Sequence, residues 1–217
     1  MRKYYFFDLD GTLADTDGDI RESWKAAMAD LGLVCPDFDR KFVAGPSIEE
    51  MTKSLFPDIY SEALAQNIRE GFGRHYDNDG FKNTLEYPGI LDEVRNLKSL
   101  GAKVYIATNK RYSGAVKMAE HFLWDKIFDG IYTSDMHKDD EIGKLRKPEL
   151  LKLILSETGA KSDECVMVGD TINDFEAARV NSIFSVGVSW GYAREGELSQ
   201  ADLVIDRAED LRKIYDL

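Results

Sequence analysis

From Pro88 to the C-terminus, short apolar segments alternate with amphipathic segments, and this alternation limits the folds open to the chain. The apolar segments resemble strands, and the segments between them carry apolar residues at helical spacing. Strands alternating with helices form right-handed βαβ units and a mostly parallel sheet, and strands apolar on both faces indicate helices on both sides. We predict an α/β fold, a Rossmann-like, mostly parallel sheet flanked by helices. Predicted strands cover residues 3–7, 103–107, 130–133, 165–168, 183–186 and 203–205, and predicted helices cover residues 90–100, 113–123, 148–158, 173–180 and 208–215.

Residues 19–80 show helical patterns and no good strand pattern. The first helix has Asp19 as its predicted N-cap. A second helix follows Ser47, where Glu50 stands at the capping-box position, and a third covers residues 61–76. An all-helical block inserted into a second domain explains this change of pattern. We predict a core of residues 1–16 and 84–217 and an inserted helical domain of residues 17–83.

The chain is acidic, with 40 Asp and Glu residues against 28 Lys and Arg residues and a net charge of −12. This charge disfavours binding to a nucleic acid polymer, because no basic patch offsets it. No apolar run approaches the ~18 residues that a membrane span needs, and the first residues lack signal-peptide features. Cys35 and Cys165 match no metal-binding spacing and are predicted to be buried free thiols. We expect a cytoplasmic protein without a membrane partner; its oligomeric state is not readable from the sequence.

Polar side chains follow three of the predicted strands. Because ligands bind at the carboxyl ends of the strands in an open α/β sheet, we expect these side chains to share one site. Clustered carboxylates repel one another and raise each other's pKa, and a hard divalent cation removes that cost. Mg²⁺ is the usual cation where phosphate is also bound. The residues are Asp8 and Asp10 after the first strand, Thr108, Asn109 and Lys110 after the second, and Asp170 and Asp174 after the fourth.

Four motifs in the core resemble those of the haloacid dehalogenase-like hydrolase superfamily, in the same order along the chain. Within this superfamily, the chain most resembles the phosphoglycolate phosphatase-like proteins. Three segments support this subgroup: Tyr-Pro-Gly at 87–89, the Thr-Asn-Lys form of the second motif, and Gly-Val-Ser-Trp-Gly-Tyr at 187–192. The motifs are Asp-Leu-Asp-Gly-Thr-Leu at 8–13, Thr-Asn-Lys at 108–110, Lys147 before Pro148, and Gly-Asp-Thr-Ile-Asn-Asp at 169–174.

The resemblance implies a role for each residue. Asp8 would attack phosphorus and form an aspartyl-phosphate, and Asp10 would act as general acid and then as general base. Asp174 would lie behind the metal site, where it orients Lys147 or a water molecule on the metal. The expected ligands of Mg²⁺ are the Asp8 and Asp170 side chains and the Asp10 carbonyl, and the expected phosphoryl-binding residues are Thr108, Asn109 and Lys147.

The resemblance also implies a phosphatase, a phosphoric monoester hydrolase, whose partner is a small phosphorylated metabolite, with 2-phosphoglycolate as the first candidate. Residues 17–83 would be the mobile cap that selects the leaving group. Phosphatases of nucleoside monophosphates or sugar phosphates are alternatives, as is a binding or regulatory protein without catalysis. A sugar phosphomutase is also open, although the mutases carry an arginine after the serine of a cap loop and Ser47 is followed by Ile48.

Three further sequence features have competing interpretations. Lys147 could be a solvated lysine at the start of a helix. The segment Gly187–Gly191 matches the Gly-X-Ser-X-Gly nucleophile pattern, but no histidine follows it in the chain, so we expect a loop near the rim of the site. Residues 180–182 replace the glycine-containing turn usual after the fourth motif, and we expect this to change a helix end without affecting catalysis.

Overall fold

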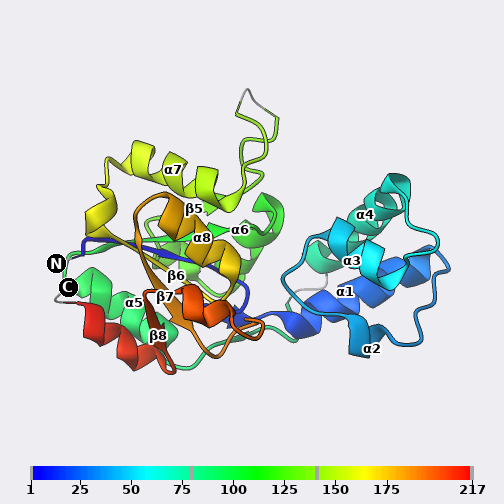
Figure 1. Cartoon of the computed structure of the whole chain (residues 1–217), viewed down its shortest axis with the longest axis horizontal. Coiled ribbons are helices and arrows are strands. Elements are labelled where there is room, and N and C mark those ends of the chain that lie inside the picture. The colour runs from blue at the N-terminus through cyan, green and yellow to red at the C-terminus, as the bar shows by residue number, and fades with distance from the viewer. Residues whose placement is uncertain (1, 79–80, 140–141, 216–217) are drawn as a thin grey trace. The chain divides into compact units, whose positions relative to one another are not determined.

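A computed structural model describes residues 2–78, 81–139 and 142–215 of the chain (Figure 1). The chain divides into two compact units. Unit 1 comprises Met1–Asp15 and Leu85–Leu217, and unit 2 comprises Thr16–Thr84. Each unit has a hydrophobic core of its own, and each is described by itself below.

Unit 1 is built on a six-stranded sheet with the order β5-β4-β1-β6-β7-β8. Every neighbouring pair in this sheet is parallel, which confirms the predicted α/β fold class. β1 lies between β4 and β6, and its Phe6 and Phe7 side chains are fully buried. The strands are β1 (Tyr4–Phe7), β4 (Lys103–Thr108), β5 (Gly130–Thr133), β6 (Cys165–Gly169), β7 (Phe184–Val188) and β8 (Leu203–Ile205).

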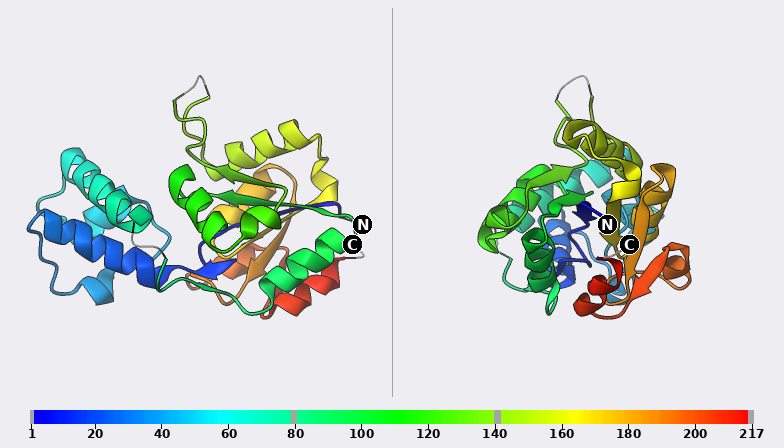
Figure 2. Two further views of the ribbon diagram at one scale, coloured as in Figure 1. Left: turned by 180° about the vertical axis from the view of Figure 1, so that it is seen from behind. Right: turned by 90° about the vertical axis from the view of Figure 1, so that its left-hand side faces the viewer.

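Helices cover both faces of this sheet (Figure 2). α7 and α8 pack against each other on one face, where Leu150 and Ala177 meet Phe6 and Met167 in the core. α5 and α6 pack against β4 and β5. The α-helices of unit 1 are α5 (Ile90–Ser99), α6 (Tyr112–His121), α7 (Lys147–Thr158) and α8 (Ile172–Val180), and its 3-10 helices are η1 (Trp124–Lys126), η2 (Ser162–Glu164), η3 (Glu197–Gln200) and η4 (Ala208–Ile214).

The last predicted helix forms a 3-10 helix, η4, rather than an α-helix. Its buried residues are Ala208, Leu211 and Ile214. Their spacing of three matches the three residues per turn of a 3-10 helix and aligns all three side chains on one face. The α-helical prediction was therefore wrong in type although correct in position.

Two very short strands, β2 (Ala14–Asp15) and β3 (Leu85–Glu86), lie where the chain leaves unit 1 and returns to it. They pair antiparallel, with Ala14 opposite Glu86 and Asp15 opposite Leu85. The sequence patterns did not predict this pair, because strands of two residues carry no readable periodicity.

Unit 2 consists of helices in the residues that the structure describes. Trp24 and Met28 of α1 join Ile68 of α4 in its core. Ser47 and Glu50 form the predicted capping box at the start of α3, with hydrogen bonds of 3.2 and 2.8 Å. The helices are α1 (Asp17–Asp30), α2 (Phe38–Lys41), α3 (Ile48–Leu55) and α4 (Glu62–Asn78).

Two predictions for unit 2 were wrong. Asp19 is not the N-cap of α1, because the helix already begins at Asp17 and Asp19 is buried in its first turn. Its carboxylate instead accepts hydrogen bonds from the Asn83 backbone at 3.1 Å and the Thr84 hydroxyl at 2.6 Å. Cys35 is a free thiol as predicted but only partly buried, since it lies in the loop after α1. Within the described residues, no helix has the length and apolar character needed to cross a membrane.

Candidate active site

The candidate site lies where β4, β1 and β6 end, at the centre of the sheet. Asp8 follows β1, and its backbone N–H donates to the Val168 carbonyl at 2.9 Å, which fixes the chain just beyond the strand. Thr108 is the last residue of β4, and Asp170 follows β6. Because the three strands are parallel neighbours, their carboxyl ends bring these side chains to one edge.

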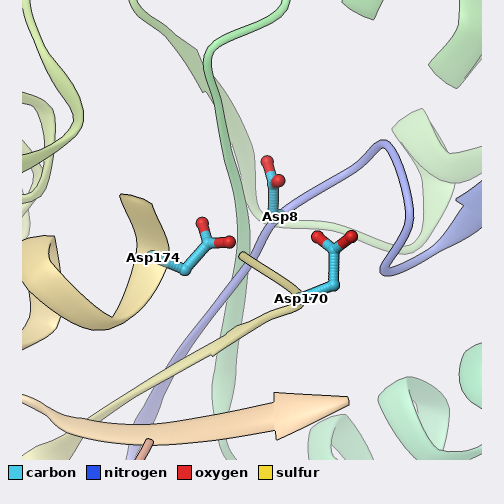
Figure 3. A group of neighbouring side chains, drawn as sticks. All are labelled: Asp8, Asp170 and Asp174. Carbon is cyan, nitrogen blue, oxygen red and sulfur yellow. The ribbon is translucent and has the colours of Figure 1, made fainter. Parts of the chain in front are cut away.

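Three carboxyl groups converge at this edge (Figure 3). Asp8, Asp170 and Asp174 each offer an oxygen atom, and these atoms lie within 4.8 Å of one another. Asp170 and Asp174 are fully buried, and the Asp8 side chain is 13% exposed. Such a cluster is unfavourable unless positive charge compensates it.

Lys147 supplies one compensating charge. Its Nζ atom lies 2.8 Å from Asp8 Oδ1 and 2.6 Å from Asp174 Oδ1. Lys147 is the first residue of α7 and is buried, so its interpretation as a solvated helix-start lysine is wrong. Burial alone would lower the pKa of Lys147, but the charges of Asp174 and Asp8 outweigh it and raise the pKa above its ordinary value.

The pKa values of two carboxyl groups show that this compensation is incomplete. Burial, reinforced by the charges of Asp174 and Asp8, raises the pKa of Asp170 to about 8. Burial also raises the pKa of Asp8 to about 6, with Lys147 acting in the opposite direction and Asp174 adding to the increase. When all three carboxyl groups are ionised, they exceed the charge of the one ammonium group by two, which is the charge of a divalent cation. The oxygen donors of the cluster therefore fit a hard divalent cation.

Asp170 and Asp174 have different supports. The oxygens of Asp170 accept hydrogen bonds from the Thr12 hydroxyl at 3.2 Å and the Tyr192 backbone N–H at 2.7 Å. Asp174 closes a capping box at the start of α8, where its Oδ2 atom accepts from both the backbone and the hydroxyl of Thr171 at 3.0 Å. Asp174 is thus held by Thr171 and Lys147, and Asp170 by Thr12 and Tyr192.

Two glycines allow the backbone to pass close to Asp170. Gly11 has a φ of +81°, and a Cβ atom there would collide with the Asp170 carboxyl group. A Cβ atom on Gly191 would collide with the same side chain. The glycines of the first motif and of the loop at 187–192 are therefore required by the close packing around one carboxylate.

The turn after β4 is supported by β5. The Thr108 hydroxyl, which is buried, accepts a hydrogen bond from the Lys110 backbone at 3.2 Å. Ser134 donates its backbone N–H to the Thr108 carbonyl at 3.1 Å and its hydroxyl to the Asn109 carbonyl at 3.2 Å. Asn109 itself is exposed. The turn thus fixes the buried Thr108 and the exposed Asn109 at the end of β4, the strand next to β1.

Sequence reasoning placed Lys110 among the side chains of this site without predicting its partner, and it did not predict that Thr12 or Tyr192 contacts Asp170. Lys110 forms an ion pair with Asp10, Thr12 donates to Asp170, and Tyr192 holds Asp170 through its backbone. Lys110 and Thr12 belong to recognised motifs, but nothing local to either motif shows which carboxylate each contacts. The loop at 187–192 was expected near the rim of the site, and its Tyr192 lies against Asp170.

Comparison with known proteins identifies the family. A family model described as haloacid dehalogenase-like hydrolase matches residues 3–180. The chain belongs to this family. A 5'-nucleotidase of Pseudomonas aeruginosa is 30% identical over 88% of this chain and 85% of its own length. A phosphoglycolate phosphatase of Agrobacterium fabrum is 30% identical over 92% of this chain and 86% of its own length.

Solved structures of haloacid dehalogenase-like hydrolases share the fold. The crystal structure of a predicted phosphatase from Clostridium acetobutylicum matches with a TM-score of 0.86 and 26% identity, covering 100% of both chains. Together with the curated relatives, this makes the chain a phosphatase within the haloacid dehalogenase-like hydrolases, a phosphoric monoester hydrolase. The family model and these relatives also confirm the family that the four motifs indicated.

Proposed function

We propose that the protein is a Mg²⁺-dependent phosphatase that hydrolyses a small phosphomonoester through an aspartyl-phosphate on Asp8. The observation that carries this proposal is the position of Asp8 at the end of the central strand, paired with Lys147 and next to Asp170. A carboxylate becomes a competent nucleophile toward a phosphate ester when cations neutralise the phosphoryl oxygens.

The reaction has two steps with balanced proton transfers. In the first, an Asp8 oxygen attacks phosphorus, the bond from phosphorus to the leaving oxygen breaks, and Asp10 gives that oxygen its proton. In the second, Asp10 takes a proton from water, the water oxygen attacks phosphorus, and inorganic phosphate leaves Asp8. Thr108, Asn109 and Lys147 bind the phosphoryl oxygens in both steps.

The same carboxylates support a metal site. A bound Mg²⁺ would be held by the side chains of Asp8 and Asp170 and by the Asp10 carbonyl, and would neutralise negative charge on the phosphoryl group. Asp174 keeps Lys147 in place through their 2.6 Å ion pair. The family resemblance supports this division of roles, and the hydrogen bonds between Thr171 and Asp174 at the start of α8 agree with it.

We propose that unit 2 is a cap that selects the leaving group. Unit 2 is inserted between the first and second motifs and has its own core. Its sequence can therefore change without disturbing the carboxylate cluster. Closure of such a cap would also exclude water while Asp8 is being phosphorylated.

For the substrate we propose 2-phosphoglycolate first and a nucleoside monophosphate second. Two relatives of equal identity support them, since one is a phosphoglycolate phosphatase and the other a 5'-nucleotidase. A sugar phosphate is a further candidate. A mutase is disfavoured because Ile48 stands where the mutases carry arginine and the Ser47 hydroxyl caps α3.

We also propose that the protein works in the cytoplasm. Cys35 and Cys165 are both free thiols. Unpaired cysteines are the normal state in a reducing compartment.

The test is phosphate release with Mg²⁺ from 2-phosphoglycolate, sugar phosphates, nucleoside monophosphates and pyrophosphate. Asp8→Asn should lower the release by at least about a thousandfold with the fold intact by circular dichroism, because it removes the nucleophile. Asp163→Asn is the matched control, since Asp163 is exposed and precedes β6 at the opposite edge of the sheet.

Each outcome decides one part of the proposal. Full activity in Asp8→Asn would overturn the aspartyl-phosphate mechanism. A clear preference for a nucleoside monophosphate would discard 2-phosphoglycolate and keep the mechanism. Transfer between two positions of a bisphosphorylated sugar, without phosphate release, would favour the mutase.

A further inference from the structure

Lys110 contacts the residue that we propose as general acid and base. Its Nζ atom lies 2.8 Å from Asp10 Oδ1. The Lys110 side chain is only 8% exposed, whereas that of Asp10 is 26% exposed. Lysine side chains are rarely buried to this extent without a charged partner. The ion pair is therefore a built feature of the site.

The backbone around Lys110 is fixed independently of this ion pair. Its N–H donates to the Thr108 hydroxyl, and Ser134 holds the carbonyls of Thr108 and Asn109. The Lys110 side chain therefore starts from a defined point at the end of β4. The Asp10 carboxylate has fewer constraints, because it is more exposed and follows the central strand by three residues.

A general acid has to hold its carboxyl group toward the leaving oxygen. Proton transfer requires the two heavy atoms to approach within hydrogen-bond distance. A carboxyl group that rotates freely spends only part of its time in that orientation. The rate of proton transfer falls in proportion. One oxygen fixed by an ammonium group leaves the other to face the reacting groups.

We propose that Lys110 is a positioning residue that fixes the Asp10 carboxylate for both proton transfers. The inference rests on the proposed function, because it assigns Lys110 a task only if Asp10 transfers protons. Direct binding of an anionic substrate group by Lys110 is the competing account, in which Asp10 merely neutralises the lysine when no substrate is bound.

A double-mutant cycle separates these two accounts. The variants are Asp10→Asn, Lys110→Met and the double variant, and the readout is kcat/KM for the best alkyl phosphomonoester of the panel. General acid–base catalysis is worth about 10²–10⁴-fold, so Asp10→Asn should lose about that much and Lys110→Met about tenfold or more. If Lys110 acts through Asp10, Lys110→Met should cause almost no further loss in the Asp10→Asn background.

Leaving-group dependence gives a second readout. The p-nitrophenolate ion leaves without needing a proton, so kcat/KM for p-nitrophenyl phosphate should fall less than about threefold in Lys110→Met. Lys110→Arg keeps the charge and should restore part of the alkyl phosphate activity. Lys152→Met, in an exposed position on α7, is the matched control for loss of a lysine.

Two results would overturn the inference. One is a Lys110→Met loss that is equal for both substrates and additive with Asp10→Asn, which is the signature of direct substrate binding. The other is full activity of Lys110→Met. Asp8→Asn and Asp10→Asn report on the proposed function itself, so normal activity in those variants would indicate its failure separately from that of Lys110.

Discussion

At the scale of single residues, the site is a balance between buried charges. Asp8, Asp170 and Asp174 bring three carboxyl groups together, and Lys147 reaches two of them. The pKa of Asp170, at about 8, shows where negative charge is least compensated, because burial and two neighbouring carboxylates act on it together. This residue should therefore gain most from a bound cation.

Mg²⁺ should raise the thermal stability of the protein through Asp170. Mg²⁺ at about 100 times its dissociation constant adds about 2.7 kcal/mol to the free energy of unfolding. Melting curves with Mg²⁺ and with EDTA should show this shift in the wild type and in Asp163→Asn, and it should be absent or much reduced in Asp170→Asn. An undiminished shift in Asp170→Asn would place the cation elsewhere.

The residues that sequence reasoning could place are those that follow regular elements. Asp8, Thr108 and Asp170 end or follow strands, and Lys147 begins a helix, so local patterns locate all four. The contact of Lys110 with Asp10 joins residues 100 positions apart and depends on side-chain direction. The chemical roles of these residues remain predictions that the proposed variants test.

At the scale of elements, η4 is attached to α5 by one buried carboxylate. Glu93 of α5 is 2% exposed at its side chain, and its Oε2 atom accepts from Arg212 at 3.1 Å and from Tyr215 at 2.6 Å. Burial would raise the pKa of Glu93, but these hydrogen bonds prevail and lower it below its ordinary value. The ionised form of Glu93 therefore stabilises the fold.

Glu93→Gln should lower the free energy of unfolding at pH 7 by about 1–3 kcal/mol, because it weakens a buried charge-assisted network. Since the folded pKa is depressed, this stabilisation is present above the ordinary value of 4.5 and is lost as the pH falls through the folded pKa. Urea unfolding at several pH values should show the two proteins converging in acid. Glu149→Gln, in a more exposed ion pair with Arg146, should cost less than about 1 kcal/mol.

The turn after α8 offers a stabilising substitution. Ser182 is exposed and has a φ of +56°, a left-handed conformation that costs most residues about 1–2 kcal/mol. Ser182→Gly should raise the free energy of unfolding by about 0.5–1 kcal/mol after the extra chain entropy of glycine is counted. Ser156→Gly, at an exposed helical position of α7, should lower it by about the same amount. Equal effects of both variants would contradict this account.

Local periodicity located most elements, and its failures have a shared cause. The bounds of β5 and β8 match the predicted ones, and β8 is an apolar Leu-Val-Ile run between two aspartates. Asp19 was misassigned because its partners, Asn83 and Thr84, lie more than 60 residues along the chain. β2 and β3 are too short to have a pattern of their own. Features set by distant partners are those that a local pattern cannot predict.

At the scale of the whole molecule, the chain leaves unit 1 and returns to it at one place. Asp15 and Leu85 lie opposite each other in the β2–β3 pair. Residues paired in this way can be joined directly by a two-residue turn. Unit 1 should therefore be able to fold without unit 2, with Asp15 and Leu85 joined by a short turn.

Replacing residues 16–84 with Asn-Gly should give a folded unit 1 that still hydrolyses p-nitrophenyl phosphate. Because unit 2 is proposed to select the leaving group, differences in kcat/KM between substrates of the panel should shrink to about tenfold or less. Circular dichroism and the substrate panel measure both effects. An unchanged substrate preference in the shortened protein would show that unit 1 carries the selectivity.

The position of β1 in the middle of the sheet also sets an order for events during synthesis. β1 leaves the ribosome before both of its neighbours, β4 and β6, which begin at Lys103 and Cys165. At ~10 residues per second, synthesis reaches β4 about 10 s after β1 and reaches β6 about 16 s after β1. Unit 2, which is continuous in sequence, can fold in that interval. The strand that leads to Asp8 is therefore made before its neighbours and paired late, and its apolar Tyr-Tyr-Phe-Phe segment is a part of the nascent chain that a chaperone would shield in that interval.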